Sequence, residues 1–236
     1  MRPILILGLI FSAILIGFTQ SPQGYDLQQN ISNAGGESSV FGANTIRPLK
    51  PRYEGIVGTP YLSEKPINGS VTLMDNKKYT GYFNFDWMDN VPMFYKKETS
   101  SYMIIDNKAV KQINLSPTYD SLIVLDRLKN EEGKLFFGQL LGQLDSTKIY
   151  MIVEKTVRKA DFSGAYNSGK KYDEILSAFS YFTFETISES CKPFKPSKKN
   201  FIQLFPSHSD KISKNSFLIK PSKPEMIGAF LKLVRN

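Results

Sequence analysis

The chain has 236 residues, with 30 Lys and Arg against 22 Asp and Glu, and only one His and one Cys. Apolar residues make up 41% and aromatic residues 13%, well above the level of a disordered chain, so a packed core can form. The single His and single Cys exclude the usual His/Cys zinc sites, iron–sulfur clusters and internal disulfides. We expect neither a metal site nor a cofactor.

Residues 1–19 have the pattern of an export signal. A weakly basic start, Met1-Arg2-Pro3, is followed by an apolar run over 4–18 that is shorter than the roughly 20 residues of a membrane-spanning helix. This pattern predicts a signal peptide over 1–19, with an uncleaved anchor as the alternative. The protein is then exported, to the periplasm or the cell surface, with no transmembrane span after cleavage. Nucleic acid is a poor candidate partner in that compartment.

The rest of the chain divides by its hydrophobic pattern. Residues 20–52 are polar, rich in Ser, Gly, Asn and Gln, and predict a flexible leader. Residues 53–191 show a period of two, which predicts an antiparallel β-rich domain. The clearest signal is a hairpin in which Val71 and Leu73 precede the turn 75–78, and Tyr79 begins the returning strand.

The stretch 135–157 is ambiguous in its first half. Phe136, Leu140 and Leu144 are spaced by four, as in a helix. However, Gly138 and Gly142 lie between them, and each glycine costs a helix about 1 kcal/mol relative to Ala. The period-two residues Ile149, Met151 and Val153 then follow a turn at Asp145-Ser146. We expect two strands here.

The last segment, 192–236, changes character and predicts helices. The run 201–205 suggests a short helix stopped by Pro206, and an amphipathic pattern over 226–234 suggests another. We expect this segment to pack on the β domain. The predicted fold class is α+β: a mainly antiparallel β-sheet domain followed by a short C-terminal helical segment.

The formal charge of +8 lies in this tail. It holds ten basic and two acidic residues, while the remainder balances at 20 against 20. Such asymmetry predicts contact with an envelope protein or an anionic surface, such as lipid head groups or an acidic glycan. The alternative is a set of lysines that only keeps short helices soluble. The candidate contact residues are Lys198, Lys199, Lys211, Lys214, Lys220 and Lys223.

Sequence motifs for catalysis are weak, so we expect no catalytic residues. His208 and Cys191 lack the neighbours of a Ser-His-Asp or Cys–His arrangement. Carboxylate pairs such as Asp86 with Asp89 fall in predicted turns, where acids are common. A cluster of aromatic residues on successive strands is a better candidate. Phe83 and Phe85 fit a core, whereas the possible ligand-binding residues are Tyr82, Trp87 and Tyr95.

Two blocks of the chain carry a resemblance. The first is 53–62, which leads into 69–73 and a turn before Tyr79; the second is 198–206, ahead of two amphipathic segments. From Tyr53 to its end the chain resembles an uncharacterised family of exported proteins from Bacteroidetes-type bacteria. The resemblance implies a bacterial envelope protein and leaves its biochemical role open.

Three functions follow as hypotheses. The first is a non-enzymatic binding or interaction module of the envelope. The second is a periplasmic carrier or receptor for an amphipathic or sugar ligand, and the third is a carboxylate-dependent hydrolase. A deep pocket lined by aromatic residues would favour the second hypothesis. Two facing carboxylates in a cleft would favour the third hypothesis. A full core with a basic stripe outside would favour the first.

Overall fold

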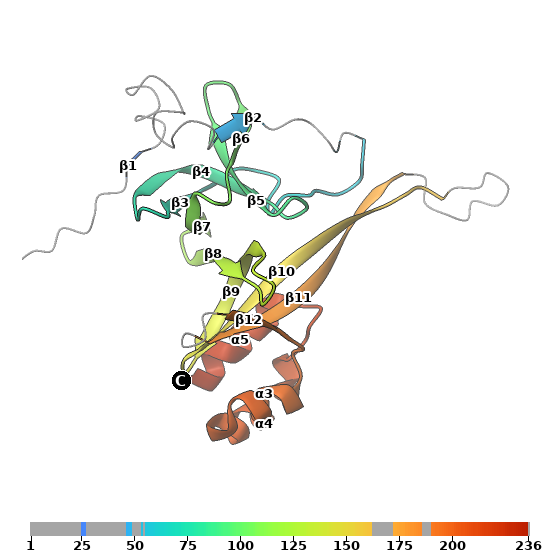
Figure 1. Ribbon diagram of the computed structural model, residues 1–236. Helices are drawn as coiled ribbons and strands as arrows, with labels where there is room; N and C mark the ends of the chain where they lie inside the picture. Colours follow the sequence, from blue (N-terminus) through green and yellow to red (C-terminus); the bar gives the residue numbers. More distant parts are fainter. Residues whose placement is uncertain are drawn as a thin grey trace, which may run out of the picture.

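The computed structural model describes residues 25–26, 46–48, 53, 55–161, 172–185 and 190–235. It confirms the predicted fold class, an antiparallel sheet followed by a short helical segment (Figure 1). The strands are β1 Tyr25–Asp26, β2 Ile46–Pro48, β3 Ile67–Leu73, β4 Lys78–Asp86, β5 Val91–Lys96, β6 Ser101–Ile105, β7 Val110–Thr118, β8 Ser121–Lys129, β9 Leu135–Leu144, β10 Thr147–Arg158, β11 Glu174–Glu185 and β12 Ser190–Phe194.

The sheet is built from two runs of consecutive strands. Its order is β12-β11-β10-β9-β8-β7-β3-β4-β5-β6-β2, so among the described strands the two runs are joined by the pairing of β7 with β3. β1 lies parallel to β4, and β2 pairs antiparallel with β6. Both of these short strands fall within the predicted leader; the predicted signal segment lies outside the described residues. The last strand, β12, runs past the expected border at residue 191.

The predicted hairpin is confirmed as β3 and β4. Its turn places Asn76 at φ 64°, and Asp75 accepts a hydrogen bond from the Lys77 backbone N–H at 3.1 Å. Val71 on β3 and Phe83 on β4 are fully buried, as the period of two requires. Phe85 is also fully buried, in agreement with its expected place in the core.

The two strands expected over 135–157 are likewise confirmed. β9 and β10 meet at a turn in which Asp145 has φ 51°. The register shifts between Ile149 and Tyr150, where a bulge interrupts the ladder. Gly142 on β9 lets helix α5 approach closely, because a Cβ there would lie 3.0 Å from Leu231 Cδ1.

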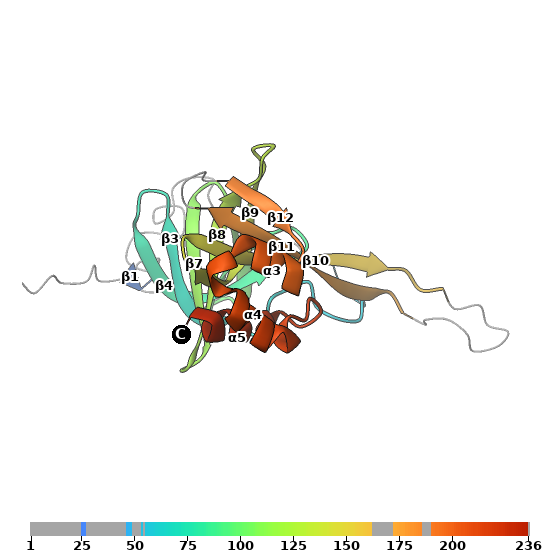
Figure 2. The same cartoon turned by 90° about the horizontal axis from the view of Figure 1, so that it is seen from below.

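The helical tail covers one side of β9–β11 (Figure 2). Ser197 caps its first helix by accepting a hydrogen bond from the Asn200 backbone N–H at 3.2 Å. The Tyr181 hydroxyl on β11 donates to the Pro221 carbonyl at 2.5 Å, which ties the sheet to the loop before the last helix. The helical elements are α3 Lys198–Leu204, the short turn η1 Pro206–His208, α4 Ser209–Asn215, the short turn η2 Ser216–Leu218 and α5 Pro224–Arg235.

One continuous hydrophobic core joins the sheet to these helices. It contains Phe83, Phe94 and Phe137 from the strands together with Phe201 and Phe230 from α3 and α5. A smaller cluster lies on the opposite face of β8–β10, around Leu128, Tyr150 and Cys191. Burial in this smaller cluster raises the pKa of the Cys191 thiol to about 11. Because the main core includes residues of α3 and α5, the helical tail is part of the folded core.

Candidate functional site

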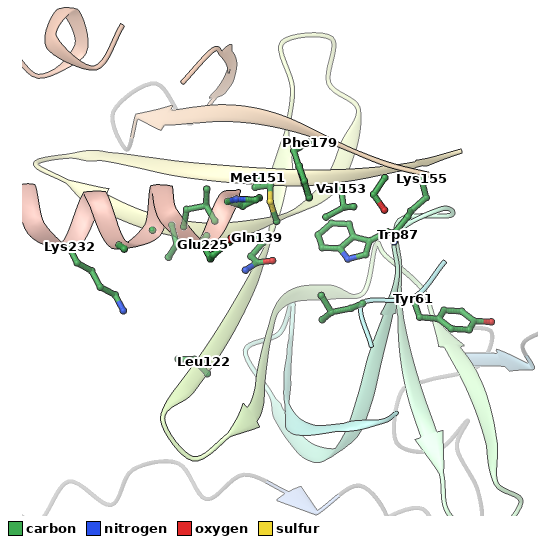
Figure 3. A pocket seen from close by; sticks show the side chains of 17 residues that line it. Tyr61, Trp87, Leu122, Gln139, Met151, Val153, Lys155, Phe179, Glu225 and Lys232 are labelled. Atoms are coloured by element: carbon green, nitrogen blue, oxygen red, sulfur yellow. The ribbon is translucent and has the colours of Figure 1, made fainter. Parts of the chain in front are cut away.

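A cleft of about 650 Å³ lies between strands β9–β11, helix α5 and the segment before β3 (Figure 3). Its walls are mostly apolar: Leu62, Trp87, Leu140, Met151, Val153 and Phe179. Lys155 on β10, and Glu225 and Lys232 on α5, add charged groups to this lining. Its size is within the range of pockets that bind small molecules.

Trp87 is held in the wall of the cleft by backbone pairing at the end of β4. The backbone N–H of Trp87 donates to the Pro60 carbonyl at 3.0 Å, and the backbone N–H of Leu62 donates to the Phe85 carbonyl at 2.8 Å. The indole also packs edge-on against Phe85, with ring centroids 4.7 Å apart. Only 4% of Trp87 is exposed, so its position is fixed by packing on several sides.

A second cleft, of about 460 Å³, shares Trp87, Val153 and Lys155 with the first. Its position follows from the strand pairing. The β9–β10 ladder ends at Met151 opposite Gln139, whereas the β10–β11 ladder continues to Arg158. The second cleft is lined by the part of β10 beyond this ladder and by the start of β9. Trp87 therefore contributes to the walls of both clefts.

Lys155 occupies an unusual place for a lysine. It continues the inward face of β10 that carries Met151 and Val153, and it is only partly exposed. Burial lowers the pKa of its ammonium. Among the described residues no carboxylate forms an ion pair with it, since neighbouring Glu154 accepts a hydrogen bond from Ser180 instead. Lys155 is thus a cation in the cleft lining that has no ion-pair partner among the described residues.

Replacing Lys155 by Met is expected to stabilise the ligand-free protein slightly at neutral pH. The apolar stem is kept, and no ammonium has to lose water. Because burial lowers the pKa of Lys155, the folded state binds this proton less tightly than the unfolded state does. The stability of the wild type therefore rises as pH increases from that lowered pKa to the ordinary value of 10.5.

The gain in the variant should consequently be largest at neutral pH and shrink towards pH 10.5. It should stay below about 1 kcal/mol, because the side chain is still partly in water. Thermal unfolding of both proteins at neutral and alkaline pH measures the difference. A variant less stable than the wild type at neutral pH would contradict the burial of this charge.

Of the three aromatic candidates, the structure brings Trp87 alone into the cleft lining. Tyr82 on β4 lies beneath the Lys97 ammonium, 4.1 Å from the ring centroid. Tyr95 on β5 packs edge-on against Tyr102, with centroids 5.2 Å apart. Both are only partly exposed and line neither cleft. Tyr82 and Tyr95 therefore have packing partners of their own and do not join Trp87.

The tail lysines lie away from the cleft lining, with Lys232 as the exception. Lys198 and Lys199 are on α3, Lys211 and Lys214 on α4, and Lys220 and Lys223 in the loop before α5. All six are exposed, and in the described part of the chain none forms an ion pair with a carboxylate. They form a basic exterior on the helical side.

Of the carboxylate pair Asp86 and Asp89, Asp86 is buried and Asp89 is exposed. Asp86 accepts hydrogen bonds from the Met88 and Asp89 backbone N–H groups, a local turn arrangement. Asp89 and Glu154 both line the second cleft. Both side chains are exposed, whereas a glycosidase acid is held out of water.

The described ranges contain no group of three His, Cys, Asp or Glu side chains placed to hold a metal ion. Nor do they contain a helix long and apolar enough to cross a membrane.

Lys155 is the residue that sequence reasoning missed. The signal was present, because Ile149, Met151 and Val153 define an inward period of two on which Lys155 is the next position. A lysine in the apolar phase of a strand marks a place where the core opens to a cleft or to solvent.

Comparison with models of known families, with curated proteins and with solved structures gives no match to this chain.

Proposed function

We propose that the protein is a non-enzymatic binding protein of the bacterial cell envelope that holds an amphipathic anion. The apolar chain of the ligand lies in the cleft beside Trp87 and α5, and its acidic head group pairs with Lys155. The observation that carries this proposal is the partly buried Lys155 ammonium, which has an apolar cleft beside it and no carboxylate partner among the described residues.

The apolar walls of the cleft would bind the chain of such a ligand, and Lys155 would bind its head group. An acyl chain gains about 0.8 kcal/mol for each CH₂ that leaves water for the apolar walls. A head-group anion on Lys155 forms a charge-assisted hydrogen bond in a poorly solvated place, where such bonds contribute about 1.5–3 kcal/mol. Glu225 on the α5 side adds a carboxylate, so a head group placed there would meet like charge.

The envelope location rests on the sequence. The signal-like segment 1–19 and the resemblance to exported bacterial proteins both support it. A carrier of single-chain amphiphiles needs an apolar cleft with room for an acyl chain, and the cleft beside Trp87 supports this part of the proposal.

The test uses Trp87, the only tryptophan, as the reporter. Oleate, kept below its aggregation concentration, is titrated into the purified protein and followed by tryptophan fluorescence, with oleyl alcohol as the uncharged counterpart. We expect a saturable change with oleate and about ten-fold weaker binding of the alcohol.

Two variants and one control sharpen the result. Lys155→Met should bind oleate about ten-fold less tightly and oleyl alcohol unchanged. Ala229→Phe, on the cleft side of α5, should weaken both ligands by filling the cleft. Lys148→Met, also on β10 but outside the cleft lining, is the matched control and should bind like the wild type. No saturable change with oleate, or full oleate affinity in Lys155→Met, would refute the proposal.

A further inference from the structure

The helical tail carries a second exposed feature, separate from the cleft. Phe217 in η2 is 66% exposed, although the next two residues, Leu218 and Ile219, pack against the core. A large aromatic side chain left in water by its own element contributes little to the core. In the part of the chain that the structure describes, no aromatic ring packs against Phe217 either.

Lysines surround Phe217 in sequence, two before it and two after it, and all four are exposed. Lys211, Lys214 and Phe217 follow one another at a spacing of three along α4 and η2, so they form one row, and all three are exposed. Ile212, which lies off this row, is fully buried. Lys220 and Lys223 continue the positive charge in the loop that follows, and Asp210 is the only acid between 209 and 223.

We infer that this surface, made of Lys211, Lys214, Phe217, Lys220 and Lys223, docks on an anionic lipid bilayer. The lysines contact the lipid phosphates, and the Phe217 ring enters the boundary between head groups and acyl chains. Charge complementarity and the exposed aromatic side chain point to the same partner, since a bilayer offers anions and an apolar layer within a few ångströms of each other. An acidic protein or glycan would engage the lysines and leave Phe217 without a role.

Docking in this way would also place the cleft near the membrane. Lys223 directly precedes Pro224 and Glu225, which line the cleft at the start of α5. The inference does not depend on the proposed function, because the surface and the cleft share none of their residues.

Flotation with vesicles tests the inference. The full chain is mixed with vesicles of phosphatidylcholine alone, or of phosphatidylcholine with phosphatidylglycerol, at low and moderate salt. We expect binding only to vesicles with phosphatidylglycerol, and weaker binding at higher salt. A lysine near an anionic surface contributes about five-fold in affinity, so Lys214→Glu with Lys220→Glu should weaken binding by more than ten-fold. Phe217→Ser should weaken it by roughly ten-fold.

The controls match each change in kind. Tyr119→Ser removes another exposed aromatic residue, in the β7–β8 turn, and Lys65→Glu with Lys108→Glu makes the same change in net charge elsewhere. Both controls should bind vesicles like the wild type, and all variants should keep its melting temperature because every changed side chain is exposed. The inference is overturned by equal binding to both vesicle types, by an effect of the controls as large as that of the tail variants, or by unchanged binding of Phe217→Ser.

Discussion

Replacing Gly69 by Ala should leave little or no folded protein. Gly69 lies in β3 opposite Gly81 of β4 and Leu115 of β7. A Cβ at this position would collide with the Asn114 carbonyl oxygen and would lie 2.9 Å from Leu115 Cδ2 and 3.1 Å from Leu115 Cα. Because two of these three atoms belong to the backbone, a rotamer change cannot relieve the contact, and β3 and β7 must move apart.

We expect a cost of about 3 kcal/mol or more, a large part of the 5–15 kcal/mol that stabilises a typical domain. The measurements are the soluble yield and, where protein is obtained, the free energy of unfolding in urea. Gly228→Ala is the matched control. A Cβ there would lie an ordinary 3.5 Å from the Leu141 carbonyl oxygen, and Ala favours a helix by up to about 1 kcal/mol. Wild-type stability in Gly69→Ala would contradict the close approach of β3 and β7.

Replacing Phe201 by Ala should have the second largest effect. Phe201 is fully buried at the centre of an aromatic group that joins three elements. Its ring lies 5.0 Å from Phe194 of β12, 4.8 Å from Phe230 of α5 and 6.4 Å from Phe205. Removing it leaves a cavity between the sheet and two helices, and such substitutions cost about 3–5 kcal/mol.

Urea unfolding measures this loss, and limited proteolysis shows whether the tail is cut first. Phe217→Ala removes the same side chain from an exposed position in the same segment and should change stability by less than about 0.5 kcal/mol. If Phe201→Ala unfolds at the wild-type urea concentration, the helical tail is not part of the core.

The hairpins could be predicted because their signals are local. The period of two at Val71 and Leu73 and the polar turn before Tyr79 need no knowledge of the rest of the chain. The stretch after Leu135 was harder, and the structure explains why. Phe136 belongs with Leu140 to the cluster on one face of β9, whereas Leu144 belongs to the main core on the other. A spacing of four also fits one face of a regular strand, so it does not separate strand from helix. The bulge opposite Ile149 and Tyr150 reverses the alternation and moves Leu144 to the other face.

The cleft could not be predicted because it depends on residues far apart in the sequence. Trp87 is held in the wall of the cleft by a backbone hydrogen bond to Pro60. Lys155 lies on β10 beyond the end of its ladder with β9. The period of two puts Trp87 in phase with the buried Phe83 and Phe85 and leaves Tyr82 out of phase, but it does not separate a core residue from one that borders a cleft. The sequence could therefore identify the aromatic cluster as a candidate, and only the packing shows which member borders a cleft.

The order of the strands has a consequence for how the chain folds. Strands β3–β6 and β7–β12 are each joined by consecutive antiparallel pairings, so most of the sheet grows by closing short loops, at small entropic cost. Pairing β3 with β7 must instead bring together segments separated by the whole first run of strands. Among the ladders that join strands β3–β12 to one another, this one spans the greatest sequence separation. We therefore expect each run to form from its own hairpins first, and the pairing of β3 with β7 at Gly69 to be the slower step.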